Sequence, residues 1–578
     1  MNRSEKSVVR KTLFAAAFSM PLAFASVALA QPAVGEAPAP VPTADLQPTA
    51  TIDEARLNEL VDRRVAKLLE ERAAKAAAQT AAKTAAEKDS KPLEGNGTGE
   101  TGGNGVVDVR LNFTCGHENV LVQPGETIPS IPGFRCGVPK SPAILFFDNY
   151  DTRFNGFENL DHQVMYKQVR KGHIEAEGAL VLRTQIAQDQ PYFDDGGSYL
   201  TVAWWQDARQ KSGKRVRFTG FPNSSDRFRL GYSYRLSWGG NEDFQRGRQK
   251  PPGFKVQYDD DKTYAFVGVK TSLYLDPETK EELATSAVLA GAGVDISDMA
   301  RIEINGGYFA RGNNELQDVT REPVQLFGAS AQLSLHQGMP VQSSIDYRLY
   351  KFDADRAIQF FQRARYPGGL SWLFMTEATV LGQTLKDPEK TGSTTIQFAT
   401  AGDVNIRVML NRIRLRFDAQ YRSLEYVLHS VPSLPTYSAF PKEYTPGGDI
   451  FAAAGIDKNW NDSLTIGLQA GVERPAILTT PASIPGGSTA TPGKTTAVIR
   501  SIDRITVLPV GESAVPMFAL KLTGQIDFAK YFAVVGNAFF TYDGNQTRLK
   551  RDNNEGLFSY EFGNFNQFGF NLTVQARI

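Results

Sequence analysis

The C-terminal sequence FGFNLTVQARI, residues 568–578, alternates without a break between apolar and polar side chains. Its apolar positions are Phe568, Phe570, Leu572, Val574, Ala576 and Ile578. Because successive side chains of a β-strand point to opposite faces, this period of two predicts a strand with one apolar and one polar face.

The same alternation recurs along the chain from about residue 142 onward. The clearest segments are 228–238, 302–311, 327–336, 345–349, 396–410, 413–421, 518–528 and 532–542. Several of them are longer than the usual strand of a soluble sandwich. We therefore predict an all-β chain of roughly 14 to 18 antiparallel strands, with about 16 as the single best value. The alternation is poorest between residues 149 and 221.

The connections between these segments alternate in length. Tight turns at 298–300, 457–462 and 529–530 are each followed by a long polar stretch, at 312–322, 473–494 and 543–556. Short turns on one side and long loops on the other are the habit of transmembrane barrels. The mean hydropathy of −0.30 is compatible with such strands, because each has one lipid face and one water face.

The N-terminus has the features of a secretory signal. A basic start precedes the apolar segment 13–29 and the sequence Ala28-Leu29-Ala30. This pattern predicts a signal peptide over residues 1–30, with the mature chain starting at Gln31. A retained N-terminal membrane anchor is the alternative.

Residues 31–105 are predicted to form a periplasmic stalk. A Pro- and Ala-rich linker leads to a helix over about 52–88, and a Gly-rich linker follows at 95–105. One helical stripe carries Leu57, Val61, Val65 and Leu68. Two heptads of apolar stripe are compatible with a solvated spacer helix and also with a short oligomerising coiled coil.

Cys115 and Cys136 are the two cysteines of the chain, and they lie in a segment, 106–140, that precedes the predicted barrel at 141–578. An even count in an exported protein favours one disulfide over two free thiols. Their spacing with His117 matches no common zinc pattern. We therefore expect no metal site and no cofactor.

Charge excludes one class of partner. The chain has 63 basic and 63 acidic residues. Removing the signal, which holds four basic residues and Glu5, leaves 59 basic and 62 acidic residues. A mature chain this close to neutral gives no support for a nucleic-acid partner.

The chain as a whole resembles the porin-like β-barrel proteins of Gram-negative outer membranes. The resemblance rests on the signal peptide, the many alternating segments and the strand at the extreme C-terminus. It implies residence in the outer membrane and contact with lipid and lipopolysaccharide. It also implies that the barrel-assembly machinery recognises residues 568–578 as an assembly signal. That signal usually ends in Phe or Trp, whereas this chain ends in Ile578.

Arginines recur on the faces predicted to point into the lumen. They are Arg227, Arg229, Arg235, Arg407, Arg412, Arg414 and Arg416. If Leu410 pairs with Ile413, then Arg407 lies opposite Arg416. Rows of arginine along a pore favour anions. The alternative is that they pair with lumenal carboxylates, for which the candidates are Asp346, Asp403, Asp418 and Glu303.

A second basic group lies between residues 353 and 366. Arg356, Arg363 and Arg365 accompany several apolar residues there. This segment is predicted to be either a pore constriction or an external loop.

Two functions remain open from the sequence. One is a porin-like channel for passive diffusion of small hydrophilic solutes, either general or weakly anion-preferring, with a homotrimer as its candidate assembly. The other is a non-conducting structural, adhesive or envelope-assembly barrel, which binds other envelope proteins through the N-terminal helix. No histidine is flanked by a Ser or Asp motif typical of hydrolases, so no enzyme activity is expected.

Overall fold

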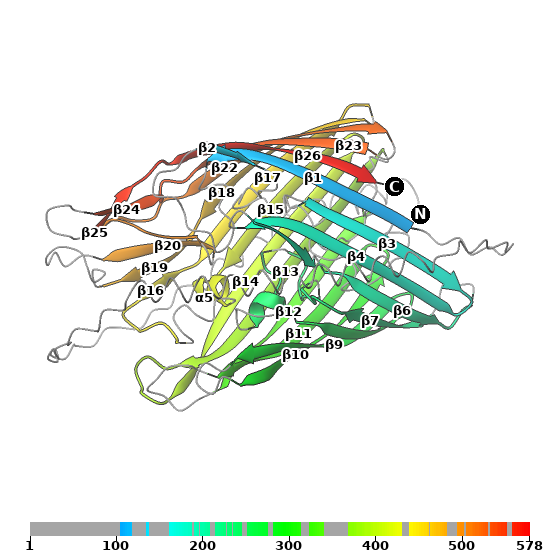
Figure 1. The fold of residues 1–578 in the computed structure, drawn as a ribbon, viewed down its shortest axis with the longest axis horizontal. Helices are drawn as coiled ribbons and strands as arrows, with labels where there is room; N and C mark the ends of the chain where they lie inside the picture. Colours follow the sequence, from blue (N-terminus) through cyan, green and yellow to red (C-terminus); the bar gives the residue numbers. More distant parts are fainter. Residues whose placement is uncertain are drawn as a thin grey trace, which may run out of the picture. The chain divides into compact units, whose positions relative to one another are not determined.

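Most of the alternating segments close into one antiparallel barrel in the computed structural model, whereas 228–238 does not join the wall and 345–349 lies outside the described residues (Figure 1). The structure describes residues 105–117, 134–137, 161–187, 190–195, 197–208, 214–226, 228–233, 235–244, 251–275, 281–313, 323–339, 368–429, 438–461, 463–481, 494–501, 504–529, 532–551 and 558–577. The predicted signal peptide, linkers and stalk helix lie outside the described residues.

The barrel wall has 18 strands, each hydrogen-bonded to its neighbours on both sides. They are β1 (Gly105–His117), β3 (Asp161–Lys171), β4 (Ile174–Ala187), β6 (Tyr199–Trp205), β7 (Arg215–Phe221), β8 (Gly253–Asp259), β9 (Thr263–Leu275), β10 (Glu282–Ser297), β11 (Ala300–Asn313), β12 (Pro323–Gln337), β13 (Leu370–Lys386), β14 (Thr394–Leu410), β15 (Ile413–Arg422), β17 (Asp449–Asn459), β18 (Leu464–Arg474), β22 (Met517–Ala529), β23 (Phe532–Tyr542) and β26 (Asn566–Arg577).

The predicted closing strand is confirmed. β26 pairs with β23 on one edge and with β1 on the other, from Asp108 opposite Arg577 to Gly116 opposite Gly569. On its outer face Phe568, Phe570 and Leu572 are between 43% and 52% exposed, as lipid-facing residues should be. The first and last strands therefore seal the wall together, while Ile578 lies outside the described residues.

The strand count is at the top of the predicted range, and the segment with the poorest alternation also belongs to the wall. Residues 161–221 supply four wall strands that weak alternation did not reveal. The barrel also begins earlier than residue 141, because β1 belongs to the segment assigned to the disulfide. In β1 the polar side chains of Asp108, Asn112 and Thr114 are buried on the lumenal face, whereas Leu111 is 55% exposed on the outer face.

The two ends of the barrel differ as predicted. Short turns at 172–173, 260–262, 298–299, 411–412, 460–463 and 530–531 lie at one end, which also holds Gly105 and Arg577. Long connections at 222–252, 423–448, 475–516 and 543–565 lie at the other. In the 411–412 turn Asn411 adopts a φ of 53°, the left-handed conformation that a two-residue hairpin needs.

Part of the long connections forms further β-structure at the long-loop end. We call the sheet of β16 (Thr445–Gly447), β19 (Ala476–Thr480), β20 (Thr495–Ser501) and β21 (Arg504–Val507) the outer sheet. A separate hairpin joins β24 (Thr547–Arg551) to β25 (Phe558–Phe562). A short helix, α5 (Leu424–Leu428), follows β15. No helix in the described part of the chain is long and apolar enough to cross a membrane.

The predicted disulfide between Cys115 and Cys136 is present. It joins β1 to the short strand β2 (Phe134–Gly137), in which Cys136 lies directly opposite Cys115. β3 pairs with the first half of β1, up to Arg110, and β2 pairs with its last residues. The disulfide therefore fastens β2 to β1, the wall strand that pairs with the closing strand β26.

Reduction of this disulfide is expected to lower the free energy of unfolding by about 3 kcal/mol, the entropic value for a loop of about 20 residues. Urea titration of the refolded barrel with and without reductant measures the loss. A variant with both Cys115→Ser and Cys136→Ser should unfold like the reduced protein and ignore reductant. Equal midpoints for the oxidised and reduced protein would contradict the prediction.

Candidate functional site

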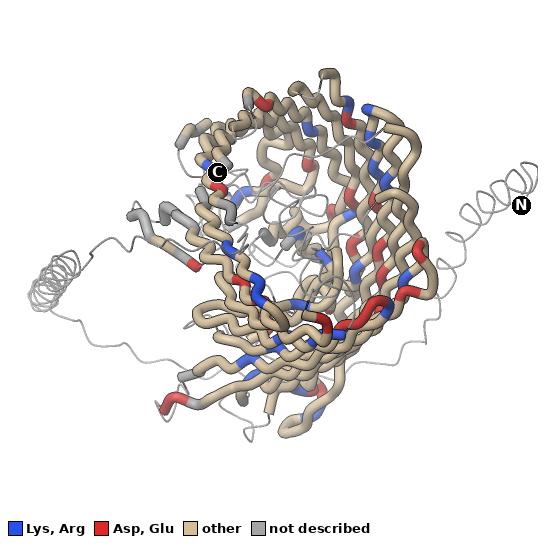
Figure 2. Tube along the Cα trace, turned by 90° about the vertical axis from the view of Figure 1, so that its right-hand side faces the viewer, with Lys and Arg blue, Asp and Glu red and all other residues tan. Residues whose placement is uncertain are grey.

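The inner face of the wall is polar and charged. Figure 2 shows basic and acidic positions spread along the strands of the ring that surrounds the lumen. Buried lumenal side chains include Asn305, Gln332, Asn405 and Asn571, each at most 3% exposed. The outer face of the same strands carries exposed Ile, Leu, Val and Phe. This is the arrangement of a barrel with lipid outside and a polar lumen inside.

The connection 222–252 between β7 and β8, here called the inward loop, folds against the inner wall. The sequence predicted a strand at 228–238, and that prediction is wrong. Gly231 and Gly239 adopt left-handed φ angles of 95° and 84°, and between them the chain doubles back so that Leu230 bridges Trp238. Glycine reaches this backbone region at little cost, which is why the segment can reverse here.

The apolar residues of the inward loop are nonetheless buried, and so are Arg229, Ser233 and Ser237 between them. Phe228, Leu230, Leu236 and Trp238 are all 0% exposed. They pack against apolar side chains that the wall turns inward, namely Phe266, Leu289, Phe309, Leu326, Leu373 and Leu381. The apolar positions of the alternation are thus sheltered from water, but they contact the lumenal wall instead of lipid.

Polar contacts fasten the inward loop to the wall strands β13, β12 and β9. The Glu377 carboxylate on β13 accepts the backbone N–H groups of Tyr232 at 2.6 Å and Ser233 at 3.3 Å. Nε1 of Trp238 donates to Ser330 of β12 at 2.9 Å. The Lys270 ammonium of β9 donates to the carbonyl of Ser225 at 2.8 Å. A carboxylate that accepts two backbone N–H groups is a charge-assisted and therefore strong anchor.

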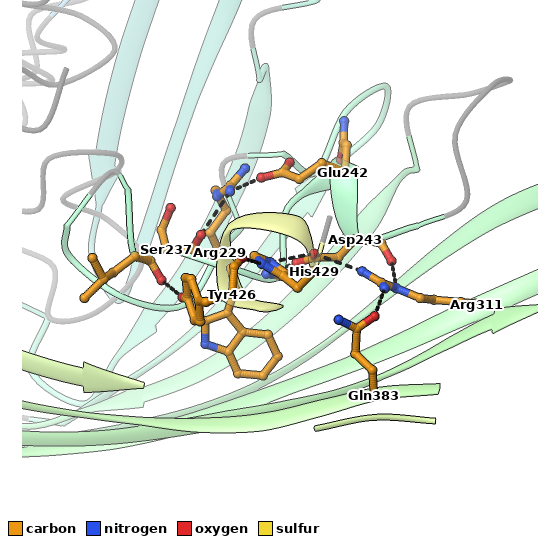
Figure 3. Close-up of polar contacts among 12 residues, drawn as sticks. Arg229, Ser237, Glu242, Asp243, Arg311, Gln383, Tyr426 and His429 are labelled. Atoms are coloured by element: carbon orange, nitrogen blue, oxygen red, sulfur yellow. Dashed lines mark hydrogen bonds and ion pairs between the residues drawn. The ribbon is translucent and has the colours of Figure 1, made fainter. Parts of the chain in front are cut away.

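Asp243, in the 3₁₀ turn Asn241–Asp243 of the inward loop, is the centre of a buried cluster (Figure 3). The Arg311 guanidinium of β11 donates to the Asp243 carbonyl at 2.7 Å and lies 3.3 Å from its carboxylate. A third Arg311 nitrogen donates to Gln383 of β13 at 2.8 Å. Burial opposes ionisation of Asp243, but the charges of His429 and Arg311 outweigh burial and hold the pKa of that carboxyl well below its ordinary value.

A second loop joins this cluster from the other side. His429, which caps the C-terminal end of α5, places Nε2 at 3.1 Å from the Asp243 carboxylate. Its Nδ1 lies 2.5 Å from the backbone carbonyl of Tyr426. The Tyr426 hydroxyl donates to the carbonyl of Leu236. Burial raises the pKa of Tyr426 well above its ordinary value, so the hydroxyl keeps the proton that it donates.

The arginines predicted at 227–235 belong to the inward loop and not to a wall strand. Arg229 binds Asp226 and Glu242 within the loop. Arg235 reaches across to β18, where it pairs with Glu473 at 3.0 Å and lies over the Phe451 ring. Arg227 lies outside the described residues.

The register predicted for the hairpin of β14 and β15 is confirmed. Leu410 pairs with Ile413, and Arg407 lies directly opposite Arg416. Arg414 and Arg416 both bind Asp457 of β17, at 2.8 and 2.9 Å, so the carboxylate partner is one that the sequence did not single out. Arg412 is not lumenal. It lies exposed in the turn and donates to the carbonyl of Trp460.

A similar group of two arginines and one aspartate, on β7 and β8, was not predicted from the sequence. Arg215 and Arg217 share the Asp259 carboxylate, at 3.2 and 2.8 Å, and Arg215 also lies over the ring of Trp205. The sequence placed Asp259 in an Asp-rich turn, whereas it is the last residue of β8 and is 2% exposed. The alternation of Arg215 and Arg217 on one strand was the available signal.

The second basic group, Arg356, Arg363 and Arg365, lies outside the described residues. β12 and β13, which flank it, have their connecting ends at the short-turn end of the barrel. Among the described residues no group of three or more His, Cys, Asp or Glu is placed to hold a metal ion.

The closed antiparallel wall, its apolar outer belt, its polar lumen and its alternating short and long connections decide the fold. The chain is a closed 18-stranded β-barrel of the kind that spans a lipid membrane. In this barrel the inward loop lies against the inner wall, with contacts that extend from Lys270 of β9 to Glu473 of β18.

Comparison with known proteins gives likeness of structure only. The sequence matches no protein-family model and no curated protein. Pseudomonas aeruginosa OpdQ is 8% identical, with a TM-score of 0.37 over 82% of this chain and 97% of that one. The outer membrane protein OprD of the same organism is 12% identical, with a TM-score of 0.34 over 83% and 96%. OpdK, also from P. aeruginosa, is 8% identical, with a TM-score of 0.36 over 82% and 98%.

Proposed function

We propose that this porin-like barrel is a channel for passive diffusion of small hydrophilic solutes, with a weak preference for anions. The observation that carries the preference is the repeated sharing of one carboxylate by two guanidinium groups. Arg414 and Arg416 share Asp457 on one side of the lumen, and Arg215 and Arg217 share Asp259 on another. In the group on β15 and β17 two guanidinium groups face one carboxylate, and an excess of positive charge favours anions in a pore.

The inward loop supports selection by size within this proposal. It is held by contacts on β9, β11, β12, β13 and β18, so its position is set by the wall. A loop fixed in this way narrows a barrel of 18 strands to a passage suited to small solutes. Residence in the outer membrane with the long loops outside the cell follows the general orientation of such barrels.

The ion selectivity of the channel is expected to depend on Arg414 and Arg416, which share the Asp457 carboxylate of β17. In a planar bilayer with a salt gradient, the reversal potential of the native channel should indicate anion preference. Replacing Arg414 and Arg416 together by Ser should remove roughly half or more of that preference, because it deletes the net positive charge of this group. Arg412→Ser is the matched control on the same hairpin, and it should leave the reversal potential unchanged.

Two results would contradict the proposal in different ways. A cation-selective native channel refutes the anion preference and leaves a channel. Folded protein that carries no current refutes the channel and favours a structural or adhesive barrel. Heat-modified migration on a gel verifies in each case that the protein inserted is folded.

A further inference from the structure

α5 presents two opposite faces to two different parts of the molecule. With 3.6 residues per turn, Leu424, Val427 and Leu428 share one side of the helix, and Tyr426 and His429 share the other. Leu424, Tyr426, Val427 and His429 are all less than 8% exposed. A helix of five residues is not stable by itself, so these two sets of contacts hold it in place.

The first face packs against the outer sheet. Leu424 and Val427 form one apolar cluster with Ala476 of β19 and Ile499 of β20. Leu428, Phe440 and Leu478 cover the edges of the same cluster. This cluster is separate from the one that contains the inward loop.

The opposite face holds the inward loop. Tyr426 belongs to the apolar cluster of that loop and donates its hydroxyl to the Leu236 carbonyl. His429 pairs with Asp243, the residue through which Arg311 also binds the loop (Figure 3). The start of α5 is tied to the wall, because Ser423 exchanges hydrogen bonds with Thr400 of β14, at 2.8 and 3.2 Å.

We propose that α5 couples the outer sheet to the inward loop, so that a change of packing on the outer sheet alters the position of the loop. The outer sheet lies at the long-loop end, and α5 is packed both against it and against the inward loop. A ligand or protein that binds the outer sheet would in this way change the width of the passage. The consequence for conductance rests on the proposed channel function, and the coupling itself does not.

Ile499→Ala tests the coupling at the far side of α5. The substitution leaves a cavity beneath Leu424 and Val427 without touching the inward loop. Hydrogen exchange of the peptide spanning 228–244, measured on the full chain in detergent micelles, should become at least roughly tenfold faster. Single-channel recordings of the same protein should show larger current fluctuations than those of the native chain.

Ile505→Ala is the matched control. Ile505 lies directly opposite Ile499 in the register of β20 and β21, but it is 37% exposed. Ile505→Ala should leave the rate of hydrogen exchange in the peptide 228–244 unchanged. An equal effect of both substitutions would show general loosening of the outer sheet and would overturn the proposal. If Ile499→Ala does not assemble, Ile499→Val gives the same comparison with a smaller cavity.

A double-mutant cycle then identifies the route. Tyr426→Phe removes the hydroxyl that binds Leu236 and leaves the ring in place. If coupling passes through α5, Ile499→Ala should accelerate exchange of 228–244 less in the Tyr426→Phe background than in the native chain. Additive effects would overturn the proposed route. Altered exchange in a protein that never conducts would refute the channel while supporting the coupling.

Discussion

Replacing Arg311 by methionine is expected to release the inward loop and to raise the single-channel conductance. Arg311 is 0% exposed, and its guanidinium holds both the carbonyl and the carboxylate of Asp243. Removing one partner of a buried ion pair costs about 3–5 kcal/mol, because the remaining charge stays buried. After this substitution Asp243 would keep its contacts with the two loops, such as those with His429 and with the backbone N–H of Gly239.

The effect of Arg311→Met on the inward loop can be measured as the rate of hydrogen exchange of the loop's own amides. A loss of 3–5 kcal/mol corresponds to roughly 10²- to 10³-fold faster exchange of amides in 228–244 if opening of the loop controls exchange. Methionine keeps most of the apolar contact of the arginine stem while removing the charge. Conductance should rise because a released loop no longer narrows the lumen.

Arg414→Met is the charge-matched control. It also removes one lumenal positive charge, but the partner of Arg414 is Asp457 on the wall strand β17 and not Asp243 of the inward loop. It should change selectivity without raising the conductance. If Arg311→Met leaves both exchange and conductance unaltered, the inward loop does not depend on Asp243 for its position.

Deleting residues 566–578 is expected to abolish assembly of the barrel. β26 pairs with nine residues of β1 and eleven of β23, so its removal leaves two facing strand edges open. An unpaired backbone group in the hydrocarbon region costs several kcal/mol, and an open edge within lipid is therefore not tolerated. The fraction of heat-modifiable protein after refolding into liposomes should fall to background.

Refolding without cellular components separates this physical requirement from recognition of the C-terminus by the assembly machinery. The matched control removes residues 31–104, which precede the first residue of β1. That shorter chain should refold as the full chain does, and loss of its oligomers alone would support a coiled-coil role for the stalk. Efficient refolding of the chain without 566–578 would mean that β1 and β23 can close the wall by themselves.

The local alternation of apolar and polar residues was sufficient to predict most strands of the wall, because a strand has only two faces. The segments at 302–311, 396–410 and 532–542 lie in β11, β14 and β23, with the expected residues outward. The pairing of Leu410 with Ile413 followed from a two-residue turn, which sets the register of a hairpin without reference to the rest of the chain. The disulfide followed from the number of cysteines and the export signal.

Prediction of the site would have required information that no single segment of the sequence contains. Alternation shows that one face of 228–238 is buried, but lipid and an apolar inner wall both satisfy that pattern. Arg414 and Arg416 were expected in the lumen, yet their partner Asp457 comes from β17, about 40 residues later, and only the strand order brings it beside them.

The sequence by itself therefore determined the number of strands to within two, the faces of most of them and the strand that closes the barrel. These features depend on local periodicity and on turns between adjacent segments. Only the tertiary structure decided that the inward loop lies against the wall from β9 to β18 and that α5 meets it at Asp243. Contacts between distant segments depend on how the wall curves, and no local pattern of residues encodes that curvature.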